Sequence, residues 1–169
     1  MLRLVGENDI ADSSIGMNAM ESSINTLAEL IPLAEKKAEG ISRWSVGQHI
    51  EHAMLATIKM SEALLASTAG EKTQKFSLLR WSLFTLGWLP RGKAKAPELV
   101  IPEERPSTER LEELVQAARV SYEKAQGADP QQWFGHFIFG VLNKKSTLRL
   151  IAVHNRHHLK IAREIVRST

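Results

Sequence analysis

Six histidines are the residues of this chain best suited to chemistry: His49, His52, His136, His154, His157 and His158. His154 and His158 stand four residues apart, so on a helix their imidazoles lie one turn apart on the same side. That side is apolar, because it is shared with Thr147, Ile151, Ile161 and Ile165. Two imidazoles in an apolar stripe must be hydrogen-bonded or bound to a partner, since burying unpaired polar groups is costly.

A third histidine, His52, lies in a similar stripe on an earlier expected helix. Its stripe contains His49, Ala53, Ala56, Met60, Ala63 and Leu64. If the two helices pack together, His52 faces His154 and His158 across the core. Three neutral imidazoles around one divalent ion leave a coordination position for water or substrate, as in catalytic metal sites. Nickel, zinc and iron all accept imidazole. The alternative is a set of core histidines satisfied by hydrogen bonds.

Helical periodicity dominates the segments that must position these histidines, and strand patterns are scarce. The expected helices cover residues 14–37, with a kink or early end at Pro32, then 45–67, 107–126, and from Asn143 or Ser146 to about 167. Ser45 and Gln48 have capping-box spacing. Gly135 and Gly140 limit the stretch before the last helix to a short turn or loop. The number and length of these helices predict an all-α four-helix bundle.

Composition indicates an ordinary globular protein, which we interpret as a single domain over residues 1–169. The chain has 43% hydrophobic residues and no cysteine, which excludes disulfides, thiolate metal sites and a cysteine nucleophile. The longest apolar-rich segment, residues 76–90, is interrupted by Arg80 and is shorter than the roughly 20 residues that span a bilayer. No signal-peptide pattern is visible at the start. We therefore expect a soluble, cytoplasmic protein.

The net charge of +3 is unevenly distributed. Residues 144–169 carry seven Lys and Arg against Glu164 alone, so the basic charge belongs to the last helix rather than to a broad face. Phosphate binding scales with the number of cations presented together. This distribution argues against nucleic acid as the main partner.

Two segments resemble the DinB-like superfamily, which includes bacillithiol transferases and the mycothiol-dependent maleylpyruvate isomerase. They are residues 44–56 (WSVGQHIEHAMLA) and 153–165 (VHNRHHLKIAREI). In that family a tryptophan opens the second helix and the first metal ligand follows eight residues later, which favours His52 over His49. The family's last helix carries H-x-x-x-H, which falls on His154 and His158. Residues 135–145 also resemble a loop in one uncharacterised branch.

The resemblance implies a four-helix bundle of up-down-down-up arrangement, with a long crossover between helices 2 and 3. That crossover is residues 71–106, whose aromatic-rich segment has no counterpart that we can align in the thiol transferases. It also implies a function: the metal binds a low-molecular-weight thiol and favours its thiolate, which attacks an electrophilic small molecule. A divalent cation lowers the pKa of a bound thiol or water, so hydrolysis stays open on the same ligands. Relatives often form homodimers.

The other histidines are candidates for supporting or catalytic roles. His49, one turn before His52, and His157, beside His158, are interpreted as packing residues or as proton-transfer residues. His136 is either a lid over the metal or an exposed loop residue. Two other functions remain open. One is a non-catalytic metal-binding or self-associating bundle, and the weaker one is a nucleic-acid accessory protein, suggested by the basic last helix and the damage-inducible family name.

Overall fold

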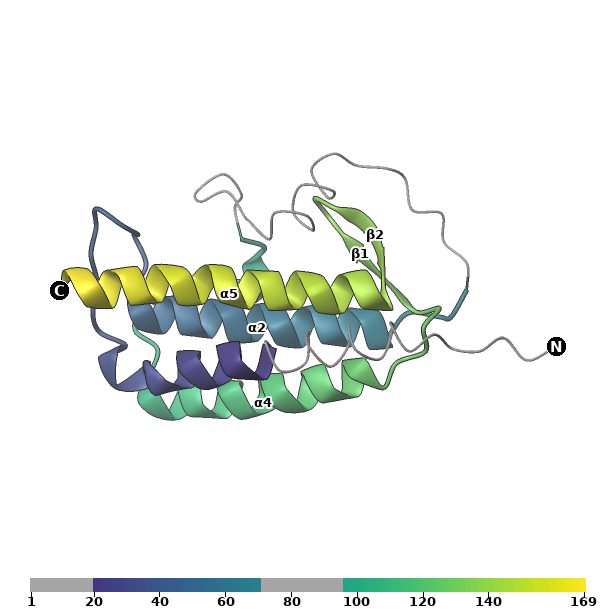
Figure 1. Ribbon diagram of the computed structural model, residues 1–169, viewed down its shortest axis with the longest axis horizontal. Helices are drawn as coiled ribbons and strands as arrows, with labels where there is room; N and C mark the ends of the chain where they lie inside the picture. Colours follow the sequence, from purple (N-terminus) through teal and green to yellow (C-terminus); the bar gives the residue numbers. More distant parts are fainter. Residues whose placement is uncertain (1–19, 71–95) are drawn as a thin grey trace.

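A computed structural model describes residues 20–70 and 96–169, and these residues are mostly helical (Figure 1). The described helices are residues 20–29, α2 (Val46–Leu65), α4 (Thr108–Gln126) and α5 (Lys144–Ser168). Two 3-10 turns accompany them, η1 (Ile31–Leu33) and η2 (Glu98–Val100). The start of the first expected helix and the aromatic-rich part of the crossover lie outside the described residues.

The helix ends follow the local signals in the sequence. The first helix gives way at residue 30 to η1, where Pro32 occupies one of the first two positions, so the early end is confirmed. Ser107 Oγ accepts a hydrogen bond from the Arg110 amide at 3.2 Å and opens α4. Asn143 Oδ1 accepts from the Ser146 amide at 2.9 Å and opens α5. Each cap satisfies an amide that the helix itself leaves free.

The start of α2 shows the expected capping box. Ser45 Oγ accepts from the Gln48 amide at 3.2 Å, and Gln48 Oε1 accepts from the Ser45 amide at 3.0 Å. The Gly47 amide donates to the Ala34 carbonyl at 2.9 Å. A Cβ at Gly47 would lie 2.9 Å from the Ala34 Cβ and 3.2 Å from Pro106 Cγ. Glycine is therefore required for the preceding turn and Pro106 to pack against this helix end.

Helix α2 is the central element, because it packs against both α4 and α5. Figure 1 shows α2 running antiparallel to α5 and in the same direction as α4. The core draws fully buried residues from all four helical segments: Ile24, Leu27, Ile50, Met54, Leu111, Ile151 and Ile165. Within the described ranges, no helix combines the length and the apolar character needed to cross a membrane.

An antiparallel hairpin corrects the expectation of a purely helical chain with a short turn or loop before α5. It consists of β1 (Trp133–His136) and β2 (Gly140–Asn143), and His136 pairs with Gly140 at the closed end. Gly140 has a φ of +69°, a left-handed conformation that glycine adopts without strain. Gly140 thus follows the three-residue loop of residues 137–139 in a left-handed conformation, whereas Gly135 lies within β1 and pairs with Val141.

Candidate metal centre

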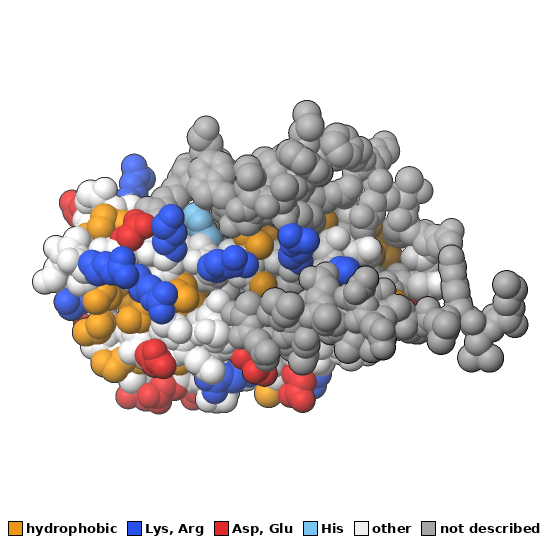
Figure 2. Space-filling view, in the orientation of Figure 1, with side chains coloured by type: hydrophobic (Ala, Val, Ile, Leu, Met, Phe, Trp, Pro, Cys, Tyr) orange, Lys and Arg blue, Asp and Glu red, His pale blue; other side chains and the backbone are white. Residues whose placement is uncertain are grey.

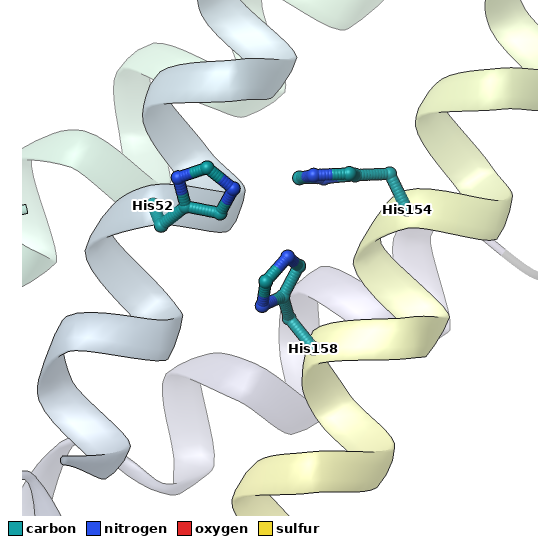
Figure 3. A group of neighbouring side chains, drawn as sticks. All are labelled: His52, His154 and His158. Carbon is teal, nitrogen blue, oxygen red and sulfur yellow. The ribbon is translucent and has the colours of Figure 1, made fainter. Parts of the chain in front are cut away.

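The structure brings together the three histidines that the sequence singled out as ligands. One ring nitrogen each from His52, His154 and His158 lies within 4.8 Å of the other two. Their rings point toward one another from α2 and α5 (Figure 3). Nitrogens bound tetrahedrally at about 2.0–2.1 Å from an ion lie roughly 3.4 Å apart, so small side-chain movements would close the site.

The amphipathic pattern of α5 explains why its two histidines face α2. Ile151, Ile161 and Ile165 are buried on the same side as His158, whereas the cations of this helix after Lys144 are exposed. The helical period of 3.6 residues then brings His154 and His158 one above the other. The ring centroids of this pair lie 4.5 Å apart, and His52 lies 5.1 Å from His154 and 4.6 Å from His158.

A backbone carbonyl fixes the protonation of His52. Its Nδ1 lies 2.7 Å from the Val100 carbonyl oxygen, which can only accept, so Nδ1 carries the proton. The lone pair of the neutral ring is then on Nε2. Burial lowers the pKa of His52, although the hydrogen bond to Val100 raises it. The neutral ring, with one nitrogen protonated by a partner and the other free, is the form of histidine that binds metals.

A buried carboxylate holds the segment that carries Val100. The Glu51 side chain is fully buried and accepts from the Glu103 amide at 2.9 Å and from Arg110 Nε at 2.6 Å. Gln48 Nε2 also donates to the Glu103 carbonyl at 3.1 Å. The segment after η2 is therefore attached to both α2 and α4. Sequence reasoning missed this support, because no local pattern connects Glu51 to a residue more than fifty positions away.

The other two ligand candidates are also kept neutral. The pKa values of His154 and His158 are well below the usual value. Burial is the largest cause, and repulsion from the neighbouring histidines is the second. Among the described residues, the Nδ1 atom of His154 is buried without a hydrogen-bond partner. An orphaned imidazole nitrogen in a buried cluster is costly unless something binds it. Neutral imidazoles with an available lone pair are metal ligands, so the residues present fit a divalent ion.

Two further aromatic rings cover the cluster at the start of α2. His49 is buried, and its Nδ1 lies 2.9 Å from Nδ1 of His158. The Trp44 indole lies against His52 and His158, with ring centroids 4.9 and 6.3 Å apart. His157 is half-buried, with its ring edge-on to that of His158 at 5.1 Å. The accessory candidate His49 is thus hydrogen-bonded to a ligand candidate.

His136 belongs to the hairpin rather than to the three-histidine cluster. Its Nδ1 accepts hydrogen bonds from the Ile138 and Phe139 amides at 3.1 and 3.3 Å. Its ring centroid is 4.7 Å from those of both Phe137 and Phe139. Burial lowers the pKa of His136 to about 4. This nitrogen therefore shapes the hairpin loop, and the ring is near enough to His154 for their charges to repel each other.

No protein-family model, curated protein or solved structure matches this chain.

Proposed function

We propose that this protein is a metal-dependent enzyme of DinB-like type. His52, His154 and His158 bind one divalent ion, with nickel, zinc and iron as candidates. The reaction is the transfer of a low-molecular-weight thiol to an electrophilic small molecule, with hydrolysis of a small substrate as the second possibility. The observation that carries this proposal is the convergence of three neutral imidazoles from two helices, one of them with an orphaned nitrogen.

The proposal includes the fold that the resemblance implied, a four-helix bundle of up-down-down-up arrangement. Three features support it. The helix over residues 20–29 and α5 run in one direction, while α2 and α4 run in the other (Figure 1). The chain between α2 and α4 is long, as a connection between parallel neighbours must be. The hairpin then connects α4 to the antiparallel α5.

A bound divalent ion would supply positive charge that stabilises the anionic form of a coordinated thiol or water. The protein's own residues provide the rest. The Val100 carbonyl holds the proton of His52 on Nδ1, so that the other nitrogen faces the cluster. Buried surroundings favour neutral over protonated imidazoles, which keeps the ligands available at neutral pH. Three protein ligands leave coordination positions open for a small molecule.

The chemistry of the nucleophile favours a thiol over water. A free thiol has a pKa of about 8.5, whereas that of bulk water is about 15.7, so a thiol needs far less help to ionise. The chain offers no thiol of its own, because it has no cysteine. The lone pair of the His136 Nδ1 atom is occupied by backbone amides, so this atom is not a free general base. A thiol cosubstrate fits a site of this kind best.

Metal analysis of untagged protein is the first test. We expect about one divalent ion per chain, and loss of that ion in His158→Ala. The neighbouring variant His157→Ala is the matched control and should retain it. Metal-loaded protein is then mixed with several thiols and a chloronitrobenzene, and thioether formation is measured by absorbance. A wild type without metal would remove the basis of the proposal, while metal without thiol transfer would leave hydrolysis or a non-catalytic bundle.

One observation bears on the weaker nucleic-acid alternative. Lys and Arg side chains gather over α5 on one face of the molecule (Figure 2). They include the exposed Arg149, Arg156, Lys160 and Arg163. A single helix with a row of cations neutralises few phosphates at once, so this face supports salt-sensitive, unspecific contact at most.

A further inference from the structure

A chain of hydrogen bonds leads away from His158, on the side opposite to the proposed ion. His158 Nδ1 lies 2.9 Å from His49 Nδ1, and His49 Nε2 lies 2.9 Å from Ser42 Oγ. Ser42 Oγ also accepts from the Trp44 amide at 3.1 Å. His158 and His49 are both buried, and Ser42 is half-buried. A second imidazole therefore connects a ligand candidate to a hydroxyl group.

Only two proton arrangements keep both imidazoles neutral, because the two Nδ1 atoms must share one proton between them. In the first, His158 donates from Nδ1 to His49, and His49 donates from Nε2 to Ser42. In the second, the Ser42 hydroxyl donates to His49, His49 donates to His158, and His158 carries its own proton on Nε2. The first arrangement leaves the lone pair of His158 Nε2 free, whereas the second blocks that atom with a proton.

The hydroxyl group at the end of the chain can serve the first arrangement. Ser42 Oγ has two lone pairs, and the Trp44 amide uses one of them. The other is available for the proton on His49 Nε2 at 2.9 Å. A cation at His158 Nε2 requires the first arrangement, because it needs the lone pair of that atom. His49 can then accept from His158.

We propose that His49 is a positioning residue that, together with Ser42, selects the tautomer of His158 that can bind the ion. The inference rests on the proposed function, since it assumes that His158 is a ligand. His49 holds the proton of His158 on Nδ1, as the Val100 carbonyl holds the proton of His52 on Nδ1. Residues that orient ligating histidines in this way typically change metal affinity by about 10–100-fold when they are replaced.

Two substitutions separate the hydrogen bond from the packing of the ring. His49→Asn places an amide oxygen near the position of Nδ1 and keeps an acceptor, while His49→Leu fills similar space without one. Zinc affinity of the untagged full chain is measured by competition with a chromophoric chelator. We expect His49→Leu to weaken zinc binding by about 10–100-fold and His49→Asn to stay within a few-fold of wild type.

A spectroscopic measurement distinguishes positioning from a merely structural role. In zinc-free wild type, nitrogen-15 NMR should show the proton of His158 on Nδ1. In zinc-free His49→Leu the proton should distribute between the two nitrogens, because no acceptor holds it on Nδ1. Ser42→Ala, at a half-buried position that should not affect folding, tests the far end of the chain. It should weaken zinc binding by a few-fold, and Ser42→Thr should restore it.

The outcomes separate the two proposals. Equal zinc affinity in wild type, His49→Leu and Ser42→Ala would overturn the positioning role while leaving the three-histidine site intact. Equal weakening by His49→Leu and His49→Asn, with an unchanged His158 tautomer, would overturn it as well, because packing alone would explain the loss. Absence of zinc binding in the wild type would overturn the proposed function itself, and the inference with it.

Discussion

The three-histidine cluster and the hairpin around His136 differ in how they use the lone pairs of their imidazole rings. Both hold imidazoles that burial keeps neutral. In the hairpin, Nδ1 of His136 faces two backbone amides, so the fold itself uses its lone pair. In the cluster, ring nitrogens of His52, His154 and His158 face one another, and Nδ1 of His154 has no hydrogen-bond partner among the described residues.

The difference shows that burial and a lowered pKa do not by themselves identify a metal ligand. His136 is half-buried and its pKa is lowered, yet its Nδ1 is occupied as an acceptor within its own loop. What distinguishes His154 is an orphaned nitrogen beside two other imidazoles. Where the lone pairs point therefore separates structural histidines from candidate ligands.

The largest expected effect is on metal affinity. His154→Ala removes one of three ligands and should weaken zinc binding by roughly 100-fold or more, whereas His136→Ala should leave it within about three-fold. Isothermal titration calorimetry on the untagged protein measures both. A comparable loss in His136→Ala would mean that the hairpin histidine takes part in the site. The distinction between this structural histidine and the ligand candidates would then be wrong.

Acid stability probes the hairpin. Unfolded His136 takes up a proton below pH 6.5, but the folded residue does so only below about 4. Between these values the unfolded chain binds more protons, so the free energy of unfolding should fall as the pH falls. His52, His154 and His158 contribute with the same sign.

His136→Asn should keep the loop, because the asparagine oxygen can accept from the same amides, and it should reduce the pH dependence. Urea unfolding of metal-free protein at several pH values between 4 and 7 measures the difference. An identical pH dependence in wild type and variant would show that His136 is protonated equally easily in both states.

The smallest expected effect concerns the backbone of the same hairpin. Gly140→Ala forces a side chain into a left-handed conformation and should lower the free energy of unfolding by roughly 1 kcal/mol. Gly135→Ala is the matched control, because a Cβ there meets only an ordinary contact at 3.8 Å with the Trp133 ring. Both are measured by urea unfolding. Equal stability of the two variants would argue against a left-handed backbone conformation at Gly140.

Local signals were sufficient to predict most helix ends. The Ser45–Gln48 capping box and the break at Pro32 act within a few residues, and the structure contains both. The helix starts expected at residue 107 and at Asn143 or Ser146 are close to the observed ones, because α4 and α5 begin directly after Ser107 and Asn143. The hairpin was not predicted, because its strands have four residues each and each of them contains a glycine. Strands this short give too little alternation to be recognised.

The ligand candidates could be predicted, but their supports could not. The i, i+4 spacing of His154 and His158 and the apolar stripe of His52 are visible in the sequence, and the structure brings the three together. The contacts of His49 with His158 and of His52 with Val100 join residues 109 and 48 positions apart. Such contacts depend on how the helices and the crossover pack, which no local pattern encodes.

The position of the ligand candidates on α2 and α5 has a thermodynamic consequence. His52 and His154 are 102 residues apart in the chain, so the unfolded polypeptide has no comparable arrangement of imidazoles. An ion that binds only the folded state would raise the free energy of unfolding by about 2.7 kcal/mol at a concentration one hundred times its dissociation constant. Such an ion would act as a reversible cross-link between the second helix and the last, whether or not a reaction takes place there.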